Sequence, residues 1–172
     1  MKSWIKVLLF CISCTLFIGC DRVTKVIAKD NLIYGEQVSY LHDTFRLQYV
    51  ENTGAALSMG DSLPKAVSFW LLSIFPLGIL VALFIYVIAH LNKMNRLLLF
   101  SFSLIIAGGL GNIIDRIIYD RHVTDFMNVG IYNLRSGIFN VADICITAGA
   151  IGLFIAYSYK QNKKAPEAGI SS

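Results

Sequence analysis

A carboxylate stands inside an apolar segment near the end of the sequence. Asp143 lies in the run Gly137-Ile-Phe-Asn-Val-Ala-Asp-Ile-Cys-Ile-Thr147, and Asn140 precedes it by three residues. Residues at this spacing share one face of a helix. A charged side chain at the centre of a bilayer costs on the order of 3 kcal/mol. Asp143 therefore indicates a functional site, whereas Asn140 alone also fits a packing amide bonded to the backbone.

Two more groups of polar residues occur at helical spacing beside other apolar segments. Asn112, Asp115 and Arg116 follow the pattern i, i+3, i+4, and Asp21 and Lys25 lie four residues apart. Each group has a structural alternative, which is an ion pair between Asp115 and Arg116 and a simple helix end at Asp21. The topology that the basic residues predict places all of these groups at one depth and on one side of the membrane, which favours a common site.

A second acid, Asp125, lies in a short connection just before the segment that contains Asp143. Burial and a neighbouring carboxylate both raise a carboxyl pKa, so two such acids can share one proton. One can then act as the base on a water while the other polarises a scissile carbonyl, which is the chemistry of peptide hydrolysis. A small proton- or ion-coupled carrier also uses membrane acids, and the residues alone do not separate these two functions.

Nucleophilic and metal chemistry have weaker support. Ser58 has no credible His partner, and no Gly-x-Ser-x-Gly motif is present. His42, His90 and His122 are scattered over both sides of the membrane, so we expect neither a metal nor another cofactor. The cysteines lie in or at the ends of apolar segments and are interpreted as packing residues: Cys11, Cys14, Cys20 and Cys145.

Four long apolar segments must position these groups. The chain has 172 residues, of which 56% are hydrophobic, and its mean hydropathy is +0.63. Each segment is near the ~20 residues that cross a bilayer core. We expect one membrane-embedded domain over residues 1–172, with outer loops at 21–66 and 115–137. The expected spans are 4–20, 67–89, 97–114 and 138–158.

Basic residues predict the orientation of these spans. Lys and Arg collect in short cytoplasmic segments, and here both chain ends and the connection 90–96 are basic. Both termini are therefore expected in the cytoplasm, and the two longer loops outside. The net charge of +4 reflects this topology, and no basic stripe or aromatic platform indicates nucleic-acid binding. The basic residues concerned are Lys2, Lys6, Lys93, Arg96, Lys160, Lys163 and Lys164.

The first outer loop contains signals for a small sheet. Residues 45–50 alternate apolar and polar side chains, as a half-buried strand does. Residues 38–40 form a weaker strand pattern, and His42-Asp43 between them predicts a turn. The small residues 55–59 predict a short interfacial helix. In the third span, Gly108, Gly109 and Gly111 are expected to let a neighbouring helix approach closely.

The N-terminus has an alternative interpretation. A basic start, an apolar run and the ending Phe17-Ile18-Gly19-Cys20 are similar to a lipoprotein signal peptide, whose cleavage would expose Cys20. Cleavage would leave three spans and would cut directly before Asp21. The uncleaved first span is the simpler interpretation.

Five motifs together resemble the lipoprotein signal peptidases, or type II signal peptidases, along nearly the whole chain. The resemblance implies an all-α membrane protein with four transmembrane helices and a small extracytoplasmic β-cradle. Its one visible departure is Leu57, where family members often have Phe. The matching motifs are Asp21-Arg-Val-Thr-Lys25, Glu51-Asn-Thr-Gly-Ala-Ala56, Gly108-Gly-Leu-Gly-Asn-Ile-Ile-Asp-Arg116, Val123-Thr-Asp-Phe126 and Phe139-Asn-Val-Ala-Asp143.

The resemblance also implies an activity and the residues that carry it. The family removes the signal peptide from diacylglyceryl-modified prolipoproteins, just before the lipidated cysteine. Asp125 and Asp143 match its catalytic aspartate pair. The implied protein is a monomer in the cell inner membrane that contacts membrane lipid; a non-catalytic lipoprotein-binding protein on the same scaffold is the other possibility. Residues that match substrate-binding or site-supporting positions are Asp21, Lys25, Asn52, Gly54, Asn112, Asp115, Arg116, Asn140 and Ala142.

Overall fold

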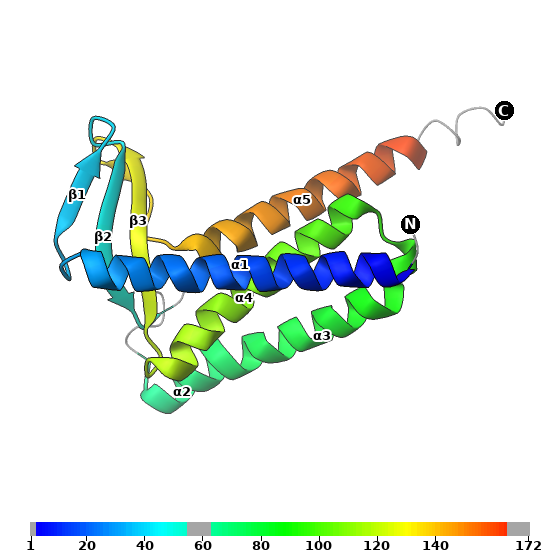
Figure 1. Cartoon of the computed structure of the whole chain (residues 1–172), viewed down its shortest axis with the longest axis horizontal. Helices are drawn as coiled ribbons and strands as arrows, with labels where there is room; N and C mark the ends of the chain where they lie inside the picture. The colour runs from blue at the N-terminus through cyan, green and yellow to red at the C-terminus, as the bar shows by residue number, and fades with distance from the viewer. Residues whose placement is uncertain (1–2, 55–62, 165–172) are drawn as a thin grey trace.

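The protein is a bundle of long helices with a small sheet across one end (Figure 1). A computed structural model describes residues 3–54 and 63–164. Within these residues, 4 helical segments are long and apolar enough to cross a membrane. They are α1 (Ser3–Asn31), the continuous segment Lys65–Lys93, α4 (Arg96–Ile118) and α5 (Val141–Lys164). The four predicted spans and the fold class are confirmed.

The helices differ from the predicted spans in where they begin and end. The first span was expected to stop at residue 20, but α1 runs unbroken through Cys20 to Asn31, so that residues 21–31 are helix and not loop. The third helix also extends beyond 97–114, to Ile118. The fourth begins at Val141 rather than 138 and continues past 158 at its other end. The cause in α1 is that Asp21 and Lys25 are buried against other helices and do not end the helix in solvent.

The second spanning segment changes its helical type partway along. It consists of α2 (Lys65–Phe69), the π-helical turn η2 (Trp70–Ile74), α3 (Phe75–His90) and the 3-10 turn η3 (Leu91–Lys93). Pro76 lies at the start of α3. A proline ring clashes with the carbonyl four residues earlier, which belongs to η2, and the wider π-helical turn accommodates it.

Helix α4 is the centre of the bundle and packs against α1, α3 and α5. Its glycines explain the close approach. A Cβ atom on Gly108 would clash with the carbonyl oxygen of Ala142 in α5, and one on Gly111 would lie 2.7 Å from Asp21 Oδ2 in α1. The predicted role of these glycines is thus confirmed, and the missing side chains bring α1, α4 and α5 together near the sheet.

The sheet has 4 antiparallel strands in the order β1-β2-β3-β4. Strands β1 (Gln37–Tyr40) and β2 (Phe45–Asn52) confirm the two strands and the turn predicted in the first loop. Strands β3 (Val123–Ile131) and β4 (Leu134–Arg135) lie in the second loop, 115–137, where no strand was predicted. The helix predicted at 55–59 lies outside the described residues.

The bundle therefore has two distinct ends. In Figure 1 the strands run across one end of the bundle, where α1 and α4 finish and α5 begins. We call this end of the bundle the sheet end. Helix α1 begins and α5 finishes at the other end (Figure 1). The C-terminal end of α4, the start of α5 and strand β3 meet at the sheet end, and these three elements carry most of the predicted site residues.

Candidate active site

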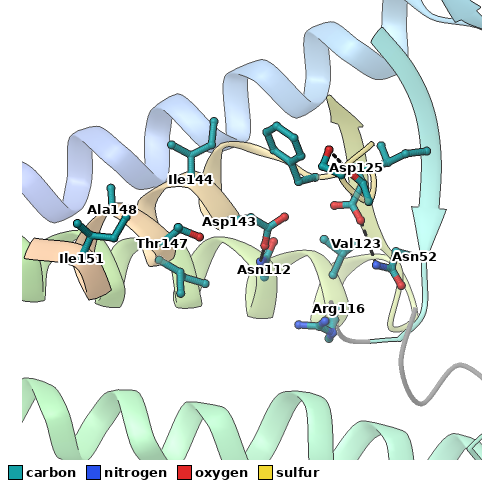
Figure 2. A pocket seen from close by; sticks show the side chains of 15 residues that line it. Asn52, Asn112, Arg116, Val123, Asp125, Asp143, Ile144, Thr147, Ala148 and Ile151 are labelled. Atoms are coloured by element: carbon teal, nitrogen blue, oxygen red, sulfur yellow. Dashed lines mark hydrogen bonds between the residues drawn. The ribbon is translucent and has the colours of Figure 1, made fainter. Parts of the chain in front are cut away.

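A cavity of about 720 Å³ opens at the sheet end between α4, α5 and the sheet. Figure 2 shows both predicted catalytic acids, Asp125 and Asp143, on its wall, with Arg116 nearby. The cavity also follows α5 away from the sheet, where its lining is mainly apolar. That arm is formed by Ile144, Thr147, Ala148 and Ile151.

Asp143 is held by the first turn of α5. Its Oδ2 accepts the backbone N–H of Asn140 at 3.0 Å, and Asn140 Oδ1 accepts the backbone N–H of Asp143 at 3.0 Å. This reciprocal arrangement is a capping box, with Asn140 as the N-cap. Asn112 Nδ2 of α4 donates to the other oxygen, Asp143 Oδ1, at 2.9 Å. The side chain is therefore fixed from two helices.

The sequence suggested that Asp125 lies in a short connection. In the structure it belongs to strand β3. It pairs with Val50 of β2, and Asn52 of the same strand donates from Nδ2 to Asp125 Oδ2 at 3.1 Å. The residue is only 3% exposed. Burial raises its pKa from 3.8 to about 6, although the hydrogen bonds from Asn52 and Asn140 oppose this shift, while the nearby Asp143 carboxylate adds to it.

Asn140 connects the two acids. It is fully buried, and its Nδ2 donates to Asp125 Oδ1 at 2.6 Å and to Asn112 Oδ1 at 3.1 Å. The same side chain caps the helix that carries Asp143. One amide thus fixes the strand acid directly and the helix acid through the capping box. This contradicts the alternative that Asn140 is a packing amide with only backbone partners.

Arg116 and Asn52 line the cavity and are connected through Gly54. Arg116 Nη2 donates to the carbonyl oxygen of Gly54 at 2.9 Å, and the Gly54 N–H donates to Asn52 Oδ1 at 2.9 Å. A guanidinium has five N–H donors, so this contact leaves Arg116 further donors at the cavity wall. The ion pair considered between Arg116 and Asp115 was wrong, because Asp115 pairs with other cations.

Those cations belong to a buried group behind the cavity, which we call the charge cluster: Asp21, Arg22, Lys25 and Asp115. Lys25 Nζ lies 2.8 Å from both Asp21 Oδ2 and Asp115 Oδ2, and Arg22 Nη1 pairs with Asp115 Oδ1. Asp21, Lys25 and Asp115 are at most 1% exposed. The cluster therefore consists of two acids and two bases, with no net charge.

The charge cluster touches the active-site cavity through two hydrogen bonds. Lys25 Nζ donates to Asn112 Oδ1 at 3.1 Å, so that the other end of this amide, Nδ2, faces Asp143. Asp21 Oδ1 accepts the backbone N–H of Ala142 at 2.9 Å, in the first turn of α5. Of the site residues named from the sequence, Asn52, Asn112, Arg116, Asp125 and Asp143 line the cavity. Lys25, Gly54 and Asn140 bond to these lining residues, Asp21 and Asp115 reach them through Lys25, and Ala142 bonds to Asp21.

Arg22 was missed by the sequence analysis. Its neighbour Asp21 was named, and a second basic residue beside Asp21 was a signal that could have identified a four-charge group. The backbone of Thr124 was also missed; its N–H donates to Asp115 Oδ2 at 3.3 Å and links the cluster to β3. Backbone donors of this kind carry no sequence signal.

The described residues offer the cavity carboxylates, amides and a guanidinium. Within residues 3–54 and 63–164, no three His, Cys, Asp or Glu side chains gather in a way that suits a metal ion, and the expectation of a metal-free site stays a prediction. Two acids whose hydrogen-bond partners among the described residues are all amides can exchange protons with a bound molecule, while the guanidinium can donate to its carbonyl groups.

Comparison with known proteins identifies the family. The model of the family Signal peptidase (SPase) II matches residues 13–159. The lipoprotein signal peptidase of Clostridium tetani is 40% identical over 137 residues, which cover 78% of this chain and 83% of that protein. That of Chlorobium phaeobacteroides is 38% identical over 161 residues, covering 87% and 96%.

Solved structures agree with the sequence comparison. A bacterial membrane enzyme is similar with a TM-score of 0.77 and 28% identity, and the match covers 91% of each chain. A second bacterial membrane enzyme has a TM-score of 0.72 and 29% identity, covering 87% of this chain and 92% of that chain. The chain therefore belongs to the signal peptidase II family and is a multi-pass membrane peptidase.

Proposed function

We propose that this protein is an aspartic endopeptidase that removes signal peptides from diacylglyceryl-modified prolipoproteins, cutting just before the lipidated cysteine. One observation carries the proposal. Asp125 and Asp143 come from a strand and a helix, line the same cavity, and are both held by Asn140. Two acids on one cavity wall are the arrangement that acid-catalysed peptide hydrolysis needs.

In the proposed mechanism the two acids share one proton. One of them accepts a proton from a water that attacks the scissile carbonyl, and the other donates a hydrogen bond to the carbonyl oxygen. As the intermediate collapses, a proton passes to the leaving nitrogen. A pKa of about 6 for Asp125 supports this scheme, because the pair then holds a proton close to neutral pH.

The remaining residues orient the substrate. Arg116 and Asn52 lie beside the acids on the cavity wall, where they can donate to backbone carbonyls of the cleavage site. The apolar arm along Ile144, Ala148 and Ile151 suits the signal helix or an acyl chain. A diacylglyceryl group lies in the outer leaflet, so a scissile bond beside it reaches the membrane surface, which is the level of the acids.

This proposal includes a location. The basic residues favour cytoplasmic termini and a site at the outer leaflet of the cell inner membrane. We expect the protein to work as a monomer without a cofactor, because the cavity, both acids and their amide partners come from a single chain.

The test is a cleavage assay. The purified protein in detergent is incubated with a diacylglyceryl prolipoprotein, and the product's N-terminus is determined by mass spectrometry. The expected product begins with the lipidated cysteine. Asp125→Asn and Asp143→Asn are each expected to lower the rate at least about a hundredfold, since each removes one proton-transfer group. Asp120→Asn is the matched control, because Asp120 pairs with Lys65 at the surface.

Two results would contradict the proposal. If both Asn variants cleave like the parent, the aspartic mechanism is wrong. If the parent binds the substrate, as shown by co-purification, but leaves it intact, the protein is a binding protein and not an enzyme. A prolipoprotein without the diacylglyceryl group is the substrate control, and equal cleavage of both forms would contradict recognition of the lipid.

A further inference from the structure

A second cavity lies between α1 and α4 in the half of the bundle away from the sheet. Its volume is about 250 Å³. The walls are mostly apolar, with Leu9 and Phe10 from α1 and Leu99 and Phe100 from α4. Both helices begin at this end of the bundle (Figure 1). The proposed catalytic reaction uses no residue of this cavity.

Two cations complete the lining, Lys6 and Arg96. Lys6 is held in place because its Nζ donates to the carbonyl oxygens of Leu91, Asn92 and Met94 at 3.1, 3.3 and 2.9 Å. These bonds use all three donors of an ammonium group. Lys6 therefore brings a fixed positive charge to the cavity, but no spare hydrogen bond.

Arg96 differs from Lys6 in its partners. It is exposed, and within residues 3–54 and 63–164 no ion pair or side-chain hydrogen bond engages its guanidinium. It is the first residue of α4, where the positive end of the helix dipole adds to its charge. A planar guanidinium with free donors suits a phosphate, which it can bind through two parallel hydrogen bonds.

The charge around this cavity is not balanced. The described acidic residues all lie in the sheet, in its flanking loops, or in the parts of α1, α4 and α5 towards the sheet. No described carboxylate is therefore available beside Lys6 and Arg96 to bind the ammonium of a zwitterionic headgroup. A molecule with apolar chains and a net negative headgroup matches both the walls and the charge.

We propose that this cavity binds an anionic phospholipid, with an acyl chain between α1 and α4 and the phosphate at Arg96 and Lys6. The site is separate from the proposed catalytic cavity and does not depend on the proposed function. The bound lipid would fill the space between the two helices at the end where no sheet holds them together.

The test is native mass spectrometry of the full chain in detergent. The protein is incubated with dioleoyl phosphatidylglycerol or with dioleoyl phosphatidylcholine, which have the same acyl chains. The parent is expected to retain about fivefold more of the anionic lipid, since one basic residue near a membrane surface contributes about 1 kcal/mol to its binding. Inorganic phosphate at millimolar concentration is expected not to displace the lipid, because it has no acyl chain.

Three variants locate the site. Arg96→Gln is expected to reduce retention of phosphatidylglycerol by up to about fivefold and leave that of phosphatidylcholine unchanged. Lys93→Gln is the matched control, because Lys93 is exposed on the adjoining turn but does not line the cavity. Ser13 of α1 also lines the cavity. Ser13→Phe fills this space without a change of charge and is expected to abolish the difference between the two lipids.

Equal retention of both lipids by the parent would overturn the proposal. An equal loss of phosphatidylglycerol retention in Lys93→Gln and Arg96→Gln would also overturn it, because it would show only general attraction to a basic surface. Displacement of the lipid by inorganic phosphate is the third result that would overturn it. Thermal unfolding in the same detergent verifies that each variant is folded. Prolipoprotein cleavage in detergent should be unchanged in Arg96→Gln.

Discussion

The charge cluster and the active-site cavity lie side by side at the sheet end, and each contains two carboxylates. In the charge cluster, Asp21 and Asp115 are paired with Lys25 and Arg22. In the cavity, the hydrogen-bond donors to the side chains of Asp125 and Asp143 are amides, those of Asn52, Asn112, Asn140 and the backbone of Asn140.

Under the proposed function, this difference separates the structural acids of the charge cluster from the two catalytic acids of the cavity. An ammonium or guanidinium at hydrogen-bond distance balances the charge of a carboxylate, and removing it leaves an uncompensated buried charge. An amide orients a carboxyl group but adds no charge, so the group can gain and lose a proton. Neighbouring acids in the same bundle thus acquire different properties from the type of their partners.

Loss of Lys25 should have the largest effect on stability. Lys25→Met leaves Asp21 without a cation and Asp115 with only Arg22, and we expect the free energy of unfolding to fall by about 3–5 kcal/mol. Chemical unfolding of the parent and the variant in mixed micelles measures this difference in the free energy of unfolding. The double variant Lys25→Met/Asp21→Asn should recover part of the loss, because it removes the carboxylate that the single variant leaves unpaired. A loss below about 1 kcal/mol in the single variant would mean that the cluster is not a charge-balanced unit.

Neutralising Asp125 should raise the free energy of unfolding, whereas loss of Lys25 lowers it. Its folded pKa of about 6 exceeds the usual 3.8, so the unfolded state ionises first as the pH rises. The free energy of unfolding should therefore fall between about pH 4 and pH 6, by on the order of 2–3 kcal/mol. In Asp125→Asn this contribution is absent, and the difference between variant and parent should grow over that range and then level off. A difference that is constant between pH 4 and pH 7 would show that the pKa of Asp125 is not raised.

Asn140 allows the capping and bridging roles to be separated. Asn140→Ser keeps a helix cap, whereas Asn140→Ala loses it and should cost about 1 kcal/mol of stability. Both variants lose the amide that donates to Asp125, and both should lower cleavage by roughly 10- to 100-fold, the effect of a hydrogen bond to a charged group. Normal cleavage by Asn140→Ser would show that the bridge between the acids is unnecessary.

The smallest effect is expected at an exposed ion pair. Lys65 and Asp120 lie 2.7 Å apart, and their side chains are 72% and 70% exposed. Water already solvates both groups, so the unfolding temperature of Lys65→Ala should equal that of the parent. A loss comparable to that of Lys25→Met would contradict the view that burial gives the charge cluster its importance.

The sequence predicted the helices well because bilayer length and basic residues constrain them independently of packing. Asp143 was identifiable for the same reason, as an acid in an apolar run. The extension of α1 was not identifiable, since Asp21, Arg22 and Lys25 resemble a helix end in water. Their partner Asp115 is more than 80 residues away in the sequence, and only the fold brings them together.

Strand β3 was missed for a different reason. An edge or one-sided strand alternates apolar and polar residues, as β2 does, whereas most of β3 is buried and shows no alternation. Asp125 and Asn128 interrupt its apolar residues and give it the appearance of a loop. The position of Asp125 opposite β2 follows from strand register, which the sequence does not encode locally.

The length of α1 has a further consequence for where cleavage occurs. A helix of 29 residues is about 43 Å long at 1.5 Å per residue, whereas the hydrocarbon core of a bilayer is about 30 Å thick. An untilted α1 therefore extends about 13 Å beyond the hydrocarbon, and Asp21 in its second half is hydrogen-bonded to Ala142 in the helix that carries Asp143. Hydrophobic mismatch then acts on the enzyme directly. A thicker bilayer would cover more of α1 and submerge the acids relative to the headgroups, and a thinner one would lift them towards water.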